Sequence, residues 1–400
     1  MVQSSVRQGL RYRGTPMAPV AGGGSPGAQA ATGLSREPRD RGARGQDQLR
    51  HGAPALLDRR GAGRLLARPS CRGLHQPVRR SHRRRARRGH QARQEVREER
   101  AMEILTYGAT GVQGGAMARR LAGTGHSVHA LLREPEKLGA LADRGIHAVG
   151  GDIGNRESVE AASRGMDRVV FNLPLVFDRE TGLRWARNVL ESAKAADVEL
   201  VIFNTGSIVP PWPTEYLHLD LKRQIIDIAD EIGQPMISLR PRLYYEVLGE
   251  PWVAGAILEQ STLAYPLPAD FRVSWCTVED VGAVAAACLD RPDLAGTGIE
   301  VGGPAALTGP DLADSFTRAL GREIGYYPLQ VSDFEKGLQQ NFGPEVGTVI
   351  AESFYYFETL GPEGMVIPEA AATADGLGVT LTSLDDWIGS RSWGDVEGRE

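Results

Sequence analysis

The stretch that decides the fold reads Ile104-Leu105-Thr106-Tyr107-Gly108-Ala109-Thr110-Gly111-Val112-Gln113-Gly114. A short apolar run, typical of a β-strand, leads into a GxxGxxG turn, and a helical pattern follows. Gly108 allows a sharp turn, Gly111 leaves room for backbone to approach a pyrophosphate, and Gly114 permits close packing of helix on strand. The first turn of the helix then points free N–H groups at the phosphates. We therefore expect a dinucleotide site that contains Gly108, Thr110, Gly111, Val112, Gln113 and Gly114.

The glycines alone would be weak evidence, because tight turns often need glycine for structure only. The flanking pattern strengthens the prediction, since a second β-prone run, 127–132, ends about 20 residues further on, as in dinucleotide-binding folds. The chain there reads Arg133-Glu134-Pro135-Glu136-Lys137. A carboxylate at this place usually binds the ribose of NAD, whereas a basic side chain accommodates a 2′-phosphate. Arg133 and Lys137 thus favour NADP(H) over NAD(H), although Glu134 is discordant and all three charges can be merely solvated.

Two more polar residues are expected beside the coenzyme. Asp152 follows the third expected strand and can accept a hydrogen bond from the adenine amino group. Alternatively, Asp152 or Asn155 caps the next helix. Asn172 ends the fourth expected strand, and the chain at this point is expected to run along the coenzyme, mainly through its backbone.

From Met102 onward, short apolar runs alternate with amphipathic stretches, which is typical of βαβ units around a parallel sheet. Strands are predicted over 103–107, 127–132, 147–150, 168–172, 199–204 and 236–240. Helices are predicted between them over 112–123, 136–144, 156–164, 179–196 and 215–233, and later over 278–290, 309–320, 331–340 and 345–359. Right-handed crossovers make this a Rossmann-like, doubly wound α/β sheet with ligands at the carboxyl ends of its strands. We expect an NADP-binding domain over 102–241 and a smaller C-terminal α/β lobe over 242–400 that binds a substrate or partner, with some sheet elements shared.

The first hundred residues differ in kind from the rest. They carry a net charge of +16 from arginine without any lysine, whereas the remaining 300 residues carry −20. Such a segment cannot bury enough surface to offset ordering costs of ~1–2 kcal/mol per residue, so residues 1–101 are predicted to be disordered. One interpretation is an arm that binds nucleic acid or acidic lipid through the arginine-rich run 79–88. The other is translation upstream of a genuine start at Met102, in which case no nucleic-acid partner is expected.

Composition also excludes several classes of protein. No run of ~18 uninterrupted apolar residues is present, so a membrane-spanning protein is not expected. The cysteines Cys71, Cys276 and Cys288 are too few and too scattered for a disulfide scaffold or a metal cluster, and no metal is predicted. A reduced, cytoplasmic environment is the expectation.

From Met102 to about Ile388 the chain resembles the NmrA-like family of atypical short-chain dehydrogenases/reductases. The resemblance is carried by the GATGVQG loop, the turn 133–137, the helix start His218-Leu219-Asp220-Leu221-Lys222, and the strand 233–241 with Tyr244-Tyr245-Glu246 after it. It implies a Rossmann domain that binds NADP(H), with a smaller lobe over the nicotinamide end. It also implies activities that range from reductases to cofactor-sensing regulators that catalyse nothing.

In the wider superfamily a Tyr-xxx-Lys pair supplies the acid and a lysine helper, and here that spacing holds His218 and Lys222. An i,i+4 separation puts both on one helix face. Lys222 is expected to bind the nicotinamide ribose, and His218 or a water to deliver the proton. The alternatives are an ordinary surface lysine and a histidine packed between the lobes. The absent tyrosine puts standard carbonyl reduction in doubt.

The substrate pocket is expected to be aromatic. Trp212, Tyr244 and Tyr245, with Trp252, could line an apolar pocket for a planar or hydrophobic molecule, although each could instead pack between lobes. Ser207 and Thr205 follow the fifth expected strand, where the superfamily often places a serine that orients the substrate. Either hydroxyl could instead only close the turn.

The leading hypothesis is an NADPH-dependent oxidoreductase that acts on a small apolar or aromatic substrate, such as a quinone or another carbonyl compound. The alternative is a non-catalytic NADP(H)-sensing regulator that acts on a protein partner. The fold alone does not choose between the two.

Overall fold

The computed structural model describes residues 101–393. The predictions made for residues 1–100, namely disorder and binding of a polyanion, lie outside the described residues. None of the helices between residues 101 and 393 is both long and apolar enough to cross a membrane.

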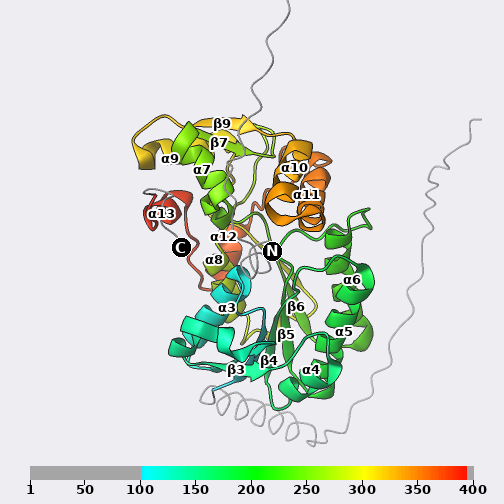
Figure 1. The fold of residues 1–400 in the computed structure, drawn as a ribbon. Coiled ribbons are helices and arrows are strands. Elements are labelled where there is room, and N and C mark those ends of the chain that lie inside the picture. The colour runs from blue at the N-terminus through cyan, green and yellow to red at the C-terminus, as the bar shows by residue number, and fades with distance from the viewer. Residues whose placement is uncertain (1–100, 394–400) are drawn as a thin grey trace, which may run out of the picture. The chain divides into compact units, whose positions relative to one another are not determined.

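Seven parallel strands form the main sheet in the order β3-β2-β1-β4-β5-β6-β8, which confirms the Rossmann-like, doubly wound class (Figure 1). The middle residues of β4 and β5 are apolar and every residue of the two strands is buried, as a parallel sheet covered by helices on both faces requires. Their bounds are β1 (Glu103–Tyr107), β2 (Ser127–Leu132), β3 (Ile146–Gly150), β4 (Arg168–Asn172), β5 (Leu200–Asn204), β6 (Met236–Pro241) and β8 (Gly298–Val301). The first six agree with the predicted strands to within one residue at each end.

Helices cover both faces of the sheet. On one face α3 (Val112–Ala122) packs against α8 (Val278–Ala287), and on the other α4 (Arg156–Ser163), α5 (Arg179–Ala195) and α6 (Leu217–Ile232) lie side by side (Figure 1). The predicted helix over 136–144 is instead a 3₁₀ segment, η1 (Pro135–Arg144), that is broken at Gly139 by a φ of 54°.

The predicted boundary at residue 241 divides the sheet only approximately. α8 and β8 come from the chain after residue 241 yet belong to the sheet half, since β8 pairs with β6 and α8 covers α3. β8 has four residues, too few for an alternating pattern to distinguish a strand from a loop.

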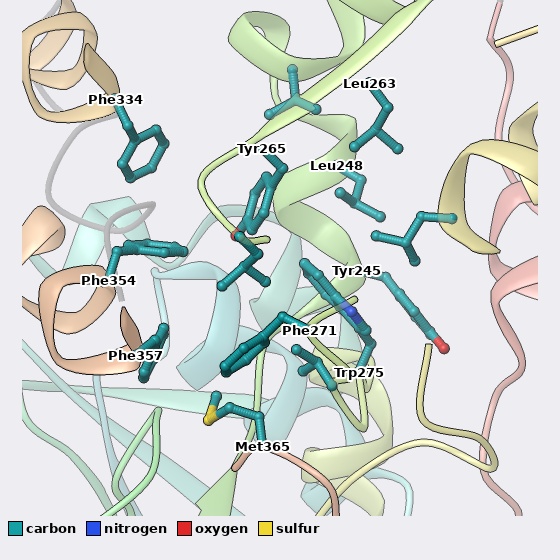
Figure 2. Close-up of a cluster of buried hydrophobic side chains, with 14 of the residues drawn as sticks. Tyr245, Leu248, Leu263, Tyr265, Phe271, Trp275, Phe334, Phe354, Phe357 and Met365 are labelled. Atoms are coloured by element: carbon teal, nitrogen blue, oxygen red, sulfur yellow. The ribbon is translucent and has the colours of Figure 1, made fainter. Parts of the chain in front are cut away.

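The smaller lobe is built around an aromatic core, part of which is drawn in Figure 2. Residues such as Tyr265, Phe271, Phe334 and Phe354 are almost fully buried in it. Between residues 245 and 389 the remaining elements are η2 (Tyr245–Gly249), α7 (Pro251–Gln260), β7 (Thr262–Tyr265), η3 (Pro292–Leu294), α9 (Gly309–Leu320), β9 (Gly325–Pro328), α10 (Val331–Phe342), α11 (Pro344–Glu358), α12 (Ala370–Gly376) and α13 (Leu384–Gly389). β7 and β9 pair in parallel as a separate two-stranded sheet.

Candidate functional site: a coenzyme cleft beside an apolar cavity

The glycine-rich turn joins β1 to α3 and packs the backbone of the first turn of α3 closely against the end of β1. Gly108 has a φ of 75°, a left-handed conformation that favours glycine, and its carbonyl accepts a hydrogen bond from the Gly111 N–H at 2.9 Å. A Cβ placed on Gly114 would lie 2.1 Å from the Gly108 carbonyl oxygen. Only glycine therefore fits at position 114, and the contact holds the first turn of α3 against the end of β1.

The N-terminus of α3 has no side-chain cap. Gly111 occupies the N-cap position, and the first turn contains no acidic residue. By contrast, α4, α5 and α8 are capped by Asn155, Asp178 and Thr277, whose side chains accept hydrogen bonds from first-turn N–H groups. The free N–H groups of α3 and its positive dipole end thus favour an anion at the carboxyl edge of the sheet.

A cleft beginning at this turn contains most of the residues predicted to hold the coenzyme. Its walls include Gly108, Thr110, Gly111, Arg133, Glu134, Lys137, Asp152 and Asn172. Lys137 is already engaged, because its Nζ lies 2.6 Å from the Glu134 carboxylate. Arg133 is exposed and makes no ion pair within residues 101–393. Of the two basic side chains, Arg133 is therefore the one available to a 2′-phosphate.

Asp152 and Asn155, which the sequence left as alternative helix caps, have separate roles. Asn155 caps α4 by accepting a hydrogen bond from Ser158 N at 3.0 Å. Asp152 Oδ1 accepts a hydrogen bond from Gly154 N at 2.7 Å, and the residue lines the cleft. Its carboxylate is thus held in place at the wall where an adenine amino group is expected to bind.

A buried network of amides joins this cleft to a second cavity. The Asn204 side chain donates to Gln113 Oε1 at 3.0 Å and to Asn172 Oδ1 at 3.1 Å, and its own Oδ1 accepts from Gly206 N. Asn172 and Asn204 are register partners at the ends of β4 and β5. Asn204 was not among the predicted site residues. The pattern that could have indicated it is an asparagine at the end of an otherwise apolar strand.

Lys222 and His218 lie on one face of α6, as their i,i+4 spacing predicted. Both line the second cavity. Lys222 is 3% exposed, and its Nζ has no hydrogen-bond partner within the described part of the chain. Burial lowers the pKa of Lys222 to about 7. Burial, together with the nearby Lys222 charge, lowers the pKa of His218 well below its ordinary value. His218 is therefore neutral at pH 7, which makes Lys222 the better proton donor of the two.

The rest of the second cavity is apolar and comes largely from the smaller lobe. Tyr265, Phe334, Phe354 and Phe357 contribute to its walls. The three phenylalanines lie on one side of the aromatic core, and Tyr265 lies between them and Trp275 (Figure 2). Leu175 lines both this cavity and the coenzyme cleft, so the two are adjacent.

A carboxylate from the lobe supports the helix that carries Lys222. Tyr216, at the N-cap of α6, provides no side-chain cap. Glu352 of α11 takes over this role, since its carboxylate accepts hydrogen bonds from the backbone N–H groups of Leu217 and His218. Sequence reasoning missed Glu352, because its partner lies more than a hundred residues away in the chain.

The structure divides the residues predicted for the substrate pocket. Ser207 and Tyr244 line the cavity, and so does Trp252 of α7. Trp212 does not, because 62% of its surface is exposed on the loop before α6. Tyr245 points instead into the lobe core, where it stacks on Trp275 with ring centroids 6.3 Å apart (Figure 2). Tyr244 is the extended residue before η2 and Tyr245 is the first residue of that 3₁₀ segment, so the two side chains leave the backbone in different directions.

Of the other residues predicted to hold the coenzyme, Val112 and Gly114 lie in the first turn of α3 and Gln113 lines the second cavity. Gln113 Nε2 is buried and has no partner within residues 101–393. Thr205 closes its turn, since its hydroxyl lies 2.5 Å from the Ser207 carbonyl, which can accept its hydrogen bond.

Comparison with known proteins agrees with this arrangement. The model described as the NmrA-like family matches residues 100–388. The (4-alkanoyl-5-oxo-2,5-dihydrofuran-3-yl)methyl phosphate reductase of Streptomyces griseus is 30% identical over 268 residues, which cover 66% of this chain and 90% of the relative.

Two solved structures share the fold. An NADPH-dependent quinone oxidoreductase of Escherichia coli, complexed with NADPH, gives a TM-score of 0.61 at 23% identity and covers 72% of this chain and 99% of its own. The negative transcriptional regulator NmrA, in complex with NADP, gives a TM-score of 0.56 at 19% identity over 72% of this chain and 95% of its own.

Proposed function

The chain belongs to the NmrA-like family, and we propose that it is an NADPH-dependent oxidoreductase that reduces a small apolar or aromatic substrate such as a quinone. The observation that carries the proposal is Lys222, a buried amine without a partner in the described chain, on the wall of an apolar cavity next to the coenzyme cleft. The names of the Streptomyces reductase and the Escherichia coli quinone oxidoreductase support the same class of reaction.

The residues present fit NADPH, which supplies a hydride when bound. The uncapped N-terminus of α3 suits the pyrophosphate, and Arg133 suits the 2′-phosphate. The orphaned Lys222 Nζ suits the hydroxyls of the nicotinamide ribose. Because a buried polar group without a partner is costly, we infer that bound coenzyme and substrate satisfy these donors.

Lys222 is also suited to handle the proton that a carbonyl reduction requires. An acid works best when its pKa is near the working pH, and a pKa of about 7 allows Nζ both to hold a proton and to release it to a substrate oxygen. Lys222 thereby takes the place of the tyrosine that the superfamily usually has. Tyr244 lies nearby, but burial raises its pKa well above the ordinary value, which makes it a poor proton donor.

The cavity supplies the remaining conditions for the reaction. Its aromatic and aliphatic walls exclude water and suit a flat apolar molecule. Glu352 holds the start of α6, and with it His218 and Lys222, against the lobe that forms these walls.

The proposed function is tested by following NADPH absorbance with a panel of quinones and aldehydes. We expect turnover with a neutral quinone such as 1,4-naphthoquinone. Tight binding of NADPH without turnover of any member would favour the alternative function, a sensor of the NADP(H) state. The structural similarity to NmrA, a negative transcriptional regulator, is the observation that supports this alternative.

Coenzyme selectivity is expected to depend on Arg133. Replacement of Arg133 by alanine removes the guanidinium available to the 2′-phosphate, and a charge-assisted hydrogen bond contributes about 1.5–3 kcal/mol. NADPH should then bind about 10- to 100-fold more weakly, with the affinity for NADH unchanged. Lys137→Ala is the matched control and should have a smaller effect, because Glu134 already pairs with this lysine. Isothermal titration of both coenzymes measures the outcome, and equal losses for NADPH and NADH would contradict the assignment.

A further inference from the structure

Arg242 directly follows β6 and forms part of the cavity wall beside Tyr244. Its Nη1 donates to Glu300 Oε2 at 2.5 Å and to the Arg240 carbonyl at 3.4 Å. Its Nε is buried and has no acceptor among the described residues. The guanidinium is thus fixed at one end, while the edge formed by Nε and Nη2 makes no hydrogen bond within residues 101–393.

The charge around Arg242 is not balanced. Glu300 also lies 3.7 Å from Arg240 Nη1, so one carboxylate serves two guanidinium groups. On the cavity wall itself the charged residues are Lys222, Arg242 and Glu250, and His218 is neutral. Because Arg240 also interacts with Glu300, this carboxylate neutralises the Arg242 guanidinium only in part.

The side-chain donors of the cavity that lack a partner require hydrogen-bond acceptors from a bound molecule. Gln113 Nε2, Lys222 Nζ and Arg242 Nε are all buried donors without a partner in the described chain. Gln113 lies in the first turn of α3 and Lys222 serves the nicotinamide end in the proposed function. Arg242 remains for the substrate.

We propose that the natural substrate has a carboxylate on its apolar body and that Arg242 selects it. The inference rests on the proposed function. A carboxylate has two oxygens at the spacing of two parallel N–H groups, which is the pattern that the Nε–Nη2 edge of a guanidinium offers. A neutral quinone fits the apolar walls but leaves this edge unsatisfied, so it binds less well.

The experiment measures binding, not turnover. A non-reducible aromatic acid, 3-(2-naphthyl)propanoate, and its primary amide are titrated into the full-length protein. The acid should bind about tenfold or more tightly than the amide. In Arg242→Gln the two should bind within about twofold of one another. Equal affinity for acid and amide in the unaltered protein, or an unchanged preference in Arg242→Gln, would overturn the proposal.

Two further variants make the result specific. Arg240→Gln is the matched control, since Arg240 shares Glu300 but does not line the cavity, and it should retain the preference. Arg242→Lys keeps the charge without the two parallel N–H groups, so the preference should fall at least about threefold. If Arg242→Gln fails to fold, this second variant decides, and an unchanged preference then rejects the role of Arg242.

The two proposals can fail separately. Reduction of 1,4-naphthoquinone without any preference for the acid would reject the carboxylate substrate and leave the reductase in place. A preference for the acid that depends on Arg242, without NADPH oxidation by any quinone or aldehyde, would reject the reductase.

Discussion

Gly114→Ala is expected to abolish NADPH binding. The new Cβ would lie 2.1 Å from the Gly108 carbonyl oxygen and 2.5 Å from its carbon, distances that real structures essentially never show. Both are backbone atoms, so the clash can be relieved only if α3 moves away from β1. That movement displaces the N–H groups that are proposed to hold the pyrophosphate. We expect at least about a 100-fold loss of NADPH affinity, measured by titration, with a lower melting temperature.

The control lies at the other end of the same helix. Gly123 has a φ of −74°, and a Cβ placed there would approach Arg120 O only to 3.4 Å, which is close to ordinary contact. Gly123→Ala should therefore leave NADPH affinity unchanged. Full NADPH affinity in Gly114→Ala would show that the coenzyme does not depend on the packing of α3 against β1.

Lys222→Met is expected to lower kcat with a quinone by at least about 100-fold, the usual contribution of a positioned acid. The same change should make the protein more stable. A buried ammonium without a partner costs several kcal/mol, and methionine fills similar volume without charge. Loss of activity with a rise in melting temperature cannot be explained by unfolding.

The pH dependence follows from the direction of the pKa shift. Burial lowers the pKa of Lys222 from 10.5 to about 7, so between these pH values the folded protein holds fewer protons at this site than the unfolded chain. The free energy of unfolding therefore increases with pH between about 7 and 10.5. Below about pH 7 the buried lysine destabilises the folded protein to its full extent. The stabilisation in Lys222→Met should be largest at pH 6 and smaller at pH 9.

The expected pH dependence of activity is opposite to that of stability. If protonated Lys222 is the acid, kcat/KM falls as the pH rises above about 7, and this limb disappears in Lys222→Met. Lys194→Met, at a lysine that donates to the Gly233 carbonyl on the protein surface, is the matched control and should preserve the profile. An unchanged kcat in Lys222→Met would remove Lys222 from the mechanism.

Local sequence patterns were sufficient to predict most strands of the main sheet and most residues of the coenzyme cleft. Strands β1 to β6 were predictable because buried parallel strands are runs of largely apolar residues, a pattern that extends in weaker form to the mostly exposed edge strand β3. The glycine-rich turn was predictable because a pyrophosphate needs bare backbone. The cleft brings together Gly108, Arg133, Asp152 and Asn172, each at the carboxyl end of a predicted strand. Because the carboxyl ends of parallel strands meet at one edge of the sheet, the places of these residues after their strands were enough to predict that they lie together.

The apolar cavity depends on contacts that no local pattern records. β8 was missed because four residues carry too little pattern, and Tyr245 was assigned to the pocket because the direction of its side chain depends on the core packed around it. Asn204 and Arg242 become informative only when the fold places them beside Gln113 and Glu300.

The amino-acid sequence by itself determined the positions of strands β1 to β6, the position of the glycine-rich turn and the i,i+4 spacing of His218 and Lys222, because each depends on neighbours within a few residues. Tertiary structure alone decided that Lys222 is buried without a hydrogen-bond partner among residues 101–393, that burial lowers the pKa of His218, and which aromatic side chains reach the cavity. Burial and the loss of hydration that shifts a pKa are produced by segments far apart in the chain, so they exist only once those segments have packed together.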